Sequence, residues 1–281
     1  MTTVSSTTLL DVSMLLEFGE LLATVADISL YVHVEQLRTG RMQATNAKGV
    51  WLNEPLALAQ NYPELSTAPL VARVKSGELL VASKGHPQYE AMLLTPLISR
   101  EKRGSGWAGG AMYGTTLVGA SKLAALQDKM FAAVLAYASM DMYFDLHHFG
   151  MRYSSRGAWE QVVNTLLKLE PDRTWVLPSD DHLRVYNLVG QNRRGASYFV
   201  EHQLFENSLE THGSGIHWDF MVSDPDHFLR ILALAFGVEP VVWGEHAKDP
   251  YGMVKLPAIE GQIPWMVMAR SYKNPWVPEA D

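Results

Sequence analysis

Apolar residues occupy most positions of an alanine-rich stretch from Thr116 to Gly150, and its polar residues fall on a narrow seam. A helix that is apolar on nearly all sides is a buried one, so this pattern predicts a central helix around which other elements pack. At about 1.5 Å per residue the run would exceed about 50 Å, so we expect a bend or break near Ser139. The positions expected to be most buried are Leu123, Met130, Val134 and Tyr137.

Helical spacing of apolar residues also marks the N-terminal part of the chain. A first helix is expected from Thr8 to Arg38, where Gly40 can end it. The segment 69–83 predicts a β-hairpin with its turn at residues 75–78, and the charged, glycine-rich segment 100–110 predicts a boundary. We therefore expect an N-terminal helical segment with a β-hairpin over residues 1–103 and a region built on the central helix over residues 104–281. One continuous domain is the alternative.

Strand patterns gather in the second half of the chain. Strands are expected at residues 174–177, 196–205, 215–222, 238–244 and 263–271. Ser155 is expected to cap a helix that extends to about Leu169, and Ser223 is expected to cap a helix that ends at Gly237. No internal repeat is evident. With helices in the first half and a mainly antiparallel sheet in the second, the sequence predicts an α+β protein.

The chain carries little charge for its size. Charged residues make up 19% of the sequence, below the roughly 25% typical of soluble domains. Together with 8 Trp and 13 Met, this composition favours a chain that buries part of its surface against other subunits. The net charge of −7 argues against broad electrostatic binding to nucleic acid or to an anionic membrane surface.

Two absences narrow the function classes further. The sequence has no cysteine, which excludes disulfides, thiolate nucleophiles and cysteine-ligated metal sites. The N-terminus lacks the basic segment of a signal peptide, and the apolar run from Leu9 to Val34 contains several carboxylates, too many for a membrane-spanning helix. We therefore expect a cytoplasmic protein that does not act at a membrane.

A glycine pattern precedes the predicted central helix. Gly104, Gly106 and Gly109 match the spacing G-x-G-x-x-G, which in dinucleotide-binding folds lets a pyrophosphate approach a helix N-terminus. No strand is expected directly before it, so a glycine linker is the favoured interpretation. If an anion binds there, Lys102 and Arg103 would help to hold it.

Histidines are concentrated in the second half, where 8 of the 10 lie between His147 and His246. If the strands at 196–205 and 215–222 pair as a hairpin, His202 lies on one strand while His217 and Asp219 share a face of the other. Two imidazoles and a carboxylate could form an open divalent metal site that activates water. The pattern H-x-D is short, and paired histidines are more often surface residues or hydrogen-bonded core residues.

Nucleophile motifs such as G-x-S-x-G are absent from the sequence. The favoured hypothesis is therefore a non-enzymatic structural or protein-binding subunit that acts by self-association or by association with a partner, as a homo-oligomer or in an assembly, and that needs no cofactor. The aromatic residues expected to anchor its interface are Trp265, Tyr272 and Trp276. The alternative is a metal-dependent hydrolase that holds a divalent metal with His202, His217 and Asp219.

Overall fold

The computed structural model describes residues 12–26, 28–36, 41–45, 51–52, 71–72, 75–76, 97–99, 109–114, 116–178, 183–192, 195–204, 216–245, 250–257 and 264–273. The chain divides into two compact units, Met1–Met142 and Tyr143–Asp281, later in the sequence than the boundary predicted at residues 103 and 104. Helices accompany an antiparallel sheet in one unit and a mixed sheet in the other, so the predicted α+β class is confirmed. Of the helices in the described ranges, none is long and apolar enough to cross a membrane.

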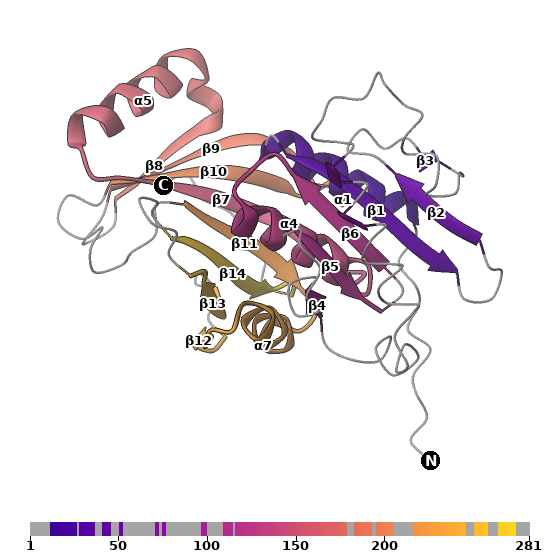
Figure 1. The fold of residues 1–281 in the computed structure, drawn as a ribbon. Coiled ribbons are helices and arrows are strands. Elements are labelled where there is room, and N and C mark those ends of the chain that lie inside the picture. The colour runs from indigo at the N-terminus through magenta and orange to yellow at the C-terminus, as the bar shows by residue number, and fades with distance from the viewer. Residues whose placement is uncertain are drawn as a thin grey trace. The chain divides into compact units, whose positions relative to one another are not determined.

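The first unit contains an antiparallel six-stranded sheet in the order β3–β2–β1–β6–β5–β4 (Figure 1). Its helix α1 (Val12–Val25) packs on α4 (Ala125–Ala138), and α4 packs against β5 and β6. The strands are β1 (Ser29–Gln36), β2 (Arg41–Thr45), β3 (Trp51–Leu52), β4 (Ile98–Ser99), β5 (Gly110–Tyr113) and β6 (Thr116–Ser121).

The predicted central helix is real but much shorter than the apolar stretch. α4 ends at Ala138 with Ser139 as its C-cap, at the place where a break was expected. The residues before it form the fully buried strand β6, and those after it form β7 (Asp145–Tyr153), so the prediction of one helix was wrong at both ends. A strand buried on both faces is as continuously apolar as a buried helix, and periodicity alone does not separate the two.

Burial within α4 follows the prediction closely. Met130, Val134 and Tyr137 are all buried, whereas Leu123 precedes the helix and is partly exposed. Near the start of the helix, Asp128 pairs with Lys75 at 2.9 Å between Oδ2 and Nζ, and both side chains are almost fully buried. Lys75 Nζ also donates a hydrogen bond to the carbonyl of Ala120 at 2.7 Å. The core of the first unit thus contains an ion pair with an additional hydrogen bond.

Two other expectations for the first unit were wrong. The first helix ends at Val25 and not at Arg38, because the alternating segment that follows pairs as β1 between β2 and β6. Residues 71–72 and 75–76 are helical, which contradicts the predicted hairpin there. The rest of the segment 69–83 lies outside the described residues.

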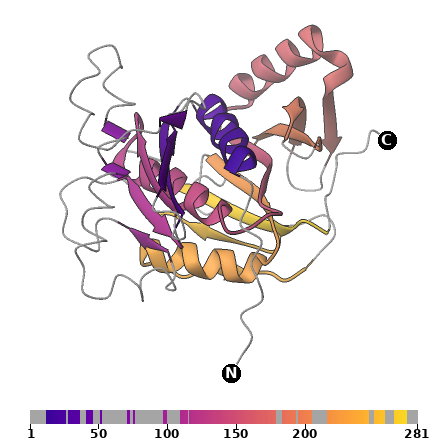
Figure 2. The ribbon, with the colours of Figure 1, turned by 90° about the vertical axis from the view of Figure 1, so that its right-hand side faces the viewer.

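The second unit is built on a mixed eight-stranded sheet in the order β12–β13–β14–β11–β7–β10–β9–β8 (Figure 1). α5 (Arg156–Leu169) contacts β7 and β10, and α7 (Pro225–Phe236) packs against β11, β13 and β14 (Figure 2). The remaining strands are β8 (Thr174–Pro178), β9 (Leu183–Gln191), β10 (Ser197–Leu204), β11 (Ile216–Val222), β12 (Val241–Val242), β13 (Gly252–Lys255) and β14 (Trp265–Ser271).

This sheet consists of two copies of one motif, a repeat that the sequence did not reveal. Each copy runs strand, helix, three strands, and its first strand pairs in parallel with its last: β7 with β10, and β11 with β14. The two first strands, β7 and β11, pair antiparallel at the centre of the sheet. The predicted strands at 196–205 and 215–222 are confirmed as β10 and β11, but they do not form a hairpin because β7 lies between them.

Both helices of the second unit lie on the same face of the sheet. Leu204 of β10 and Tyr153 of β7 pack with α5, while Phe220 of β11 contacts Phe228 of α7 edge-on. Phe149 of β7 and Trp218 of β11 stack on each other on this face, between the residues that pack with α5 and those that pack with α7. Side chains alternate along a strand, so the residues next to these in β7, β10 and β11 point to the opposite face of the sheet. We call this opposite face the site face.

The helices of the repeat begin at local capping residues. Ser155 accepts a hydrogen bond from the backbone N–H of Ala158 at the start of α5, as predicted. At α7 the N-cap is Asp224, which accepts from the N–H of His227 at 2.9 Å, so the prediction of Ser223 was wrong by one residue. Gly237 ends α7 in the left-handed conformation with φ 67°.

This geometry predicts which of two neighbouring residues stabilises α7. Asp224→Ala is expected to lower the free energy of unfolding by about 1 kcal/mol, because it removes the acceptor for the N–H of His227. Ser223→Ala, in which the cap is intact, serves as the matched control and should change the stability much less. Urea denaturation of both variants checks this; an equal loss in the two variants would contradict the cap assignment.

Candidate metal centre

Three side chains from three strands of the site face bring their ligand atoms together. They are His148 of β7, Glu201 of β10 and His217 of β11, and all three are buried. Nε2 of His148 lies 3.1 Å from Nε2 of His217. Oε2 of Glu201 lies 2.9 Å from Nε2 of His217 and 3.5 Å from Nε2 of His148. The three atoms therefore form a small, nearly regular triangle.

The size of this triangle fits one metal ion. Nitrogen and oxygen ligands lie about 2.1 Å from Zn²⁺, so two neighbouring ligands are about 3.0 Å apart when they subtend a right angle and about 3.4 Å apart in a tetrahedron. The observed separations of 2.9, 3.1 and 3.5 Å span these two values. Two imidazoles and one carboxylate on one face of the ion would leave the opposite side for other ligands.

Glu201 is held so that one oxygen faces the histidines. The hydroxyl of Tyr186 donates a hydrogen bond to Oε1 at 2.9 Å, which leaves Oε2 toward His217. Burial raises the pKa of Glu201, but hydrogen bonds from His148 and His217 outweigh it and hold the pKa well below its usual value. The carboxylate is therefore ionised, as a metal ligand must be.

His217 depends on a glycine in the neighbouring strand. Gly150 of β7 lies opposite His217, and a Cβ at Gly150 would collide with the imidazole ring. Burial lowers the pKa of His217, which favours the neutral imidazole that binds metals. Among the described residues, Nδ1 of His217 has no hydrogen-bond partner, so the packing against Gly150 and the contact with Glu201 fix the ring.

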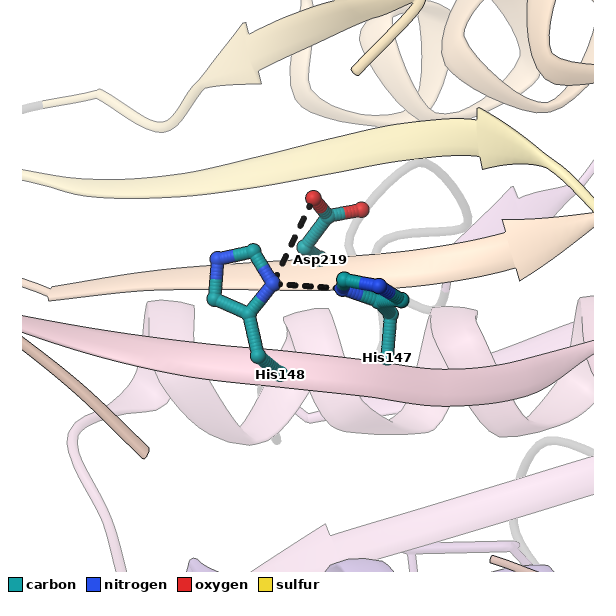
Figure 3. Close-up of side chains that lie close together, drawn as sticks. All are labelled: His147, His148 and Asp219. Carbon is teal, nitrogen blue, oxygen red and sulfur yellow. Dashed lines mark hydrogen bonds and ion pairs between the residues drawn. The ribbon is translucent and has the colours of Figure 1, made fainter. Parts of the chain in front are cut away.

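His148 is held from its other ring nitrogen (Figure 3). Its Nδ1 lies 2.7 Å from Nδ1 of His147 and 3.6 Å from Oδ2 of Asp219. The two histidines are consecutive, yet both approach Asp219, because the pairing of β7 with β11 shifts register by one residue at this point. A metal-binding histidine usually has such a partner at its second nitrogen, and the partner fixes the ring and its tautomer.

Asp219 forms a buried ion pair with Arg270. Nε of Arg270 donates a hydrogen bond to Oδ2 of Asp219 at 3.0 Å, and both side chains are buried. Burial raises the pKa of Asp219, but the charges of Arg270, His148 and His147 and the hydrogen bond from Arg270 together outweigh it and bring the pKa to about 2. His147, His148 and Asp219 also lie close enough to hold an ion. Since a metal there would compete with the guanidinium for Oδ2, we favour the set with Glu201.

The repeat explains why three protein ligands meet and not four. His148 and His217 occupy equivalent positions, since each precedes the N-cap of the next helix by the same number of residues. Glu201 pairs with Gly150, two residues after His148, and in the second copy Met268 pairs with Asp219, two residues after His217. A methionine thus occupies the position equivalent to Glu201.

The predicted set of His202, His217 and Asp219 is only partly brought together. His217 and Asp219 share the site face, but His202 points to the helix face, where its Nδ1 lies 3.0 Å from the hydroxyl of Tyr153. The correction has a simple cause: β10 pairs with β7 and not with β11, so its alternation turns Glu201 toward His217. Glu201 and His148 are not among the metal ligands predicted from the sequence. The paired histidines were the available signal, but they lay in a predicted helix.

The position of His202 predicts a pH dependence of stability. Burial lowers its pKa from 6.5 to about 4, so the folded protein keeps His202 neutral while the unfolded chain binds a proton below pH 6.5. Stability contributed by this group is full above pH 6.5 and is lost as the pH falls toward 4, by roughly 3 kcal/mol in total. Denaturation of the wild type and of His202→Gln between pH 7 and pH 4 measures this. Curves that stay parallel would contradict it.

The predicted anion-binding segment contributes little that the structure describes. Lys102, Arg103, Gly104 and Gly106 lie outside the described residues. Gly109 has φ 89°, and a Cβ there would collide with the carbonyl of Ala120 and with Lys75. Its role in the described part of the chain is close packing.

The predicted interface residues lie at the C-terminal end of the second unit. Trp265 is partly buried in β14, with its ring 6.2 Å from that of Trp218. Tyr272 stacks on Tyr143 at 3.9 Å. Trp276 lies outside the described residues. Participation of these residues in an interface stays a prediction.

Comparisons with known proteins give no family. No protein-family model matches the chain, and no curated protein matches it. Among solved structures, a variant of Streptomyces coelicolor methylmalonyl-CoA epimerase in complex with 2-nitronate-propionyl-CoA matches 44% of this chain and 96% of its own, with 13% identity and a TM-score of 0.31. A methylmalonyl-CoA epimerase in complex with methylmalonyl-CoA and NH4+ gives the same identity and TM-score over 93% of its chain. At this level the likeness carries no argument about the function of this chain.

Proposed function

We propose that this chain is a divalent-metal enzyme whose ion is bound by His148, Glu201 and His217. The observation that carries the proposal is the triangle of Nε2, Nε2 and Oε2 atoms with sides of 2.9, 3.1 and 3.5 Å. Three features support it: an ionised Glu201 fixed by Tyr186, a glycine that makes room for His217, and a partner at the second nitrogen of His148. A cluster of polar residues with only a structural role would not require these three features at one place.

The ligand set favours iron(II) and the oxidation of an oxygen-bearing substrate by dioxygen. Two histidines and one carboxylate on one face, with open positions opposite, are the arrangement used by non-haem iron oxygenases. Met268, at the position equivalent to Glu201, supplies no fourth carboxylate and so favours open positions. Zinc-dependent hydrolysis, the alternative that the sequence predicts, needs only one open position and is the second candidate.

A metal titration tests the centre itself. Protein stripped with a chelator is expected to bind one Fe²⁺, Mn²⁺ or Zn²⁺ per chain by calorimetry. His148→Ala, Glu201→Gln and His217→Ala should each weaken this binding more than about 100-fold, beyond the usual cost of outer-shell changes. His227→Ala, which removes an exposed histidine of α7, is the matched control and should bind as the wild type does. Equal binding by all four variants would overturn the centre.

A second measurement separates the two chemistries. Nitric oxide binds to Fe²⁺ only where a coordination position is open, and the complex has a characteristic electron paramagnetic resonance spectrum. The iron-loaded wild type is expected to give that spectrum. A protein that binds Zn²⁺ but gives no nitrosyl spectrum with iron would favour the hydrolase instead.

Self-association, or association with a protein partner, stays a prediction from composition. Light scattering on the full chain at micromolar concentration is expected to give a mass above the 31.3 kDa of one chain. A mass of one chain would contradict it. This result is independent of metal binding, because a metal enzyme can be a monomer or an oligomer.

A further inference from the structure

Two arginines lie on the site face beside the proposed metal ligands. Arg152 of β7 and Arg184 of β9 are both paired with Gln203 of β10, so the three residues form one row across neighbouring strands. Glu201 lies two residues before Gln203, which places the row about 7 Å along the sheet from the carboxylate. Nε of Arg184 reaches back to within 3.6 Å of Oε1 of Glu201.

The row is held in place and open to solvent on one side. Nε of Arg152 donates a hydrogen bond to Oε1 of Gln203 at 3.2 Å, which fixes the plane of its guanidinium group. The side chain of Arg184 is 39% exposed, in contrast to 4% for Glu201. A small molecule could therefore reach Arg184 from solvent.

The charges in this region favour an anion. Burial lowers the pKa of Arg152, the charge of Glu201 raises it, and the charge of Arg184 lowers it. A divalent ion at Glu201 would add two positive charges. It would also neutralise the carboxylate whose negative charge otherwise offsets the two arginines. A substrate carboxylate would offset this excess, and guanidinium groups bind carboxylates through two parallel hydrogen bonds.

We propose that Arg152 and Arg184 form a carboxylate-binding subsite, so that the substrate is a small organic acid with a metal-binding oxygen at one end and a carboxylate at the other. The inference rests on the metal centre proposed above and adds the class of substrate. Gln203 is a positioning residue in it, because it orients Arg152.

A pair of matched acids tests the subsite on the Mn²⁺-loaded protein. 2-Hydroxyglutarate and 2-hydroxypentanoate carry the same metal-binding head, but only the first has a distal carboxylate. Calorimetry is expected to show that the wild type binds 2-hydroxyglutarate about 10- to 100-fold more tightly, the range of charge-assisted hydrogen bonds. Arg184→Gln and Arg152→Gln should each reduce this preference several-fold, and the double variant should abolish it.

Controls separate this proposal from the metal centre. The affinity for Mn²⁺, measured first in every variant, reports that the fold and the metal ligands are intact. Arg230→Gln removes an exposed arginine of α7, which is paired with Asp226, and should leave the preference unchanged. A wild type that binds Mn²⁺ but not 2-hydroxyglutarate preferentially, or a double variant that retains the preference, would overturn the subsite alone. A wild type that binds no metal would overturn the centre and with it the subsite.

Discussion

Asp128→Ala is expected to lower the free energy of unfolding by about 3–5 kcal/mol, the usual cost of leaving one member of a buried ion pair without its partner. Lys75 would keep its hydrogen bond to Ala120 but lose the carboxylate 2.9 Å away, in a position where its side chain is 7% exposed. Burial raises the pKa of Asp128 against the effect of Lys75, which shows how costly a charge is at this place. Chemical denaturation of the full chain measures the loss.

Two matched variants make this result specific. Asp172→Ala removes an exposed carboxylate and should change the stability by less than about 0.5 kcal/mol. Lys75→Met combined with Asp128→Leu removes both charges, and it should recover most of the stability lost in the single variant. A single variant as stable as the wild type would mean that Lys75 finds water or another acceptor when Asp128 is absent.

Gly150→Ala is expected to weaken metal binding more than about 100-fold, as much as the loss of a ligand. A methyl group at this position would occupy the space of the His217 ring, so the ring must move away from Glu201. Calorimetric titration with Mn²⁺ checks the affinity. His217 is then the candidate ligand that moves, whereas Tyr186 still holds Oε1 of Glu201 and His147 still contacts Nδ1 of His148.

The control for this variant is another glycine of the same unit. Gly157 is exposed near the start of α5, and a Cβ there would meet only Ser155 Oγ at 4.0 Å. Gly157→Ala should therefore bind metal as the wild type does and be slightly more stable, since alanine favours the helix. Unchanged metal binding in Gly150→Ala would show that His217 is not a ligand in this position.

Local chemistry could be predicted from the sequence, and long-range pairing could not. The cap at Ser155 and the end of α7 at Gly237 depend on a few neighbouring residues, and both predictions are confirmed. The α+β class followed from the gathering of strands in the second half. The strand β7 could not be distinguished from a helix, because its partners on either side come from residues 197–204 and 216–222, far along the chain.

The prediction of the candidate site was partly wrong for the same reason. The pattern H-x-D correctly marked His217 and Asp219 as residues of one face, since alternation within a strand is a local property. Which residue of β10 faces them depends on the strand that lies between, and the register turns Glu201 inward and His202 outward. The observed set therefore has Glu201 in place of its neighbour His202, and His148 in place of Asp219.

The paired strand–helix–strand copies have a consequence for how such a centre can arise. Two identical copies, associated across the edge that β7 and β11 share, would bring two histidines and two identical third residues to the same point. Symmetry would then force either two carboxylates or none. Joined in one chain, the copies can differ, and here one carries Glu201 where the other carries Met268. Joining the two copies in one chain thus permits an asymmetric set of ligands, with one carboxylate on one side of the proposed ion and room for a reactant on the other.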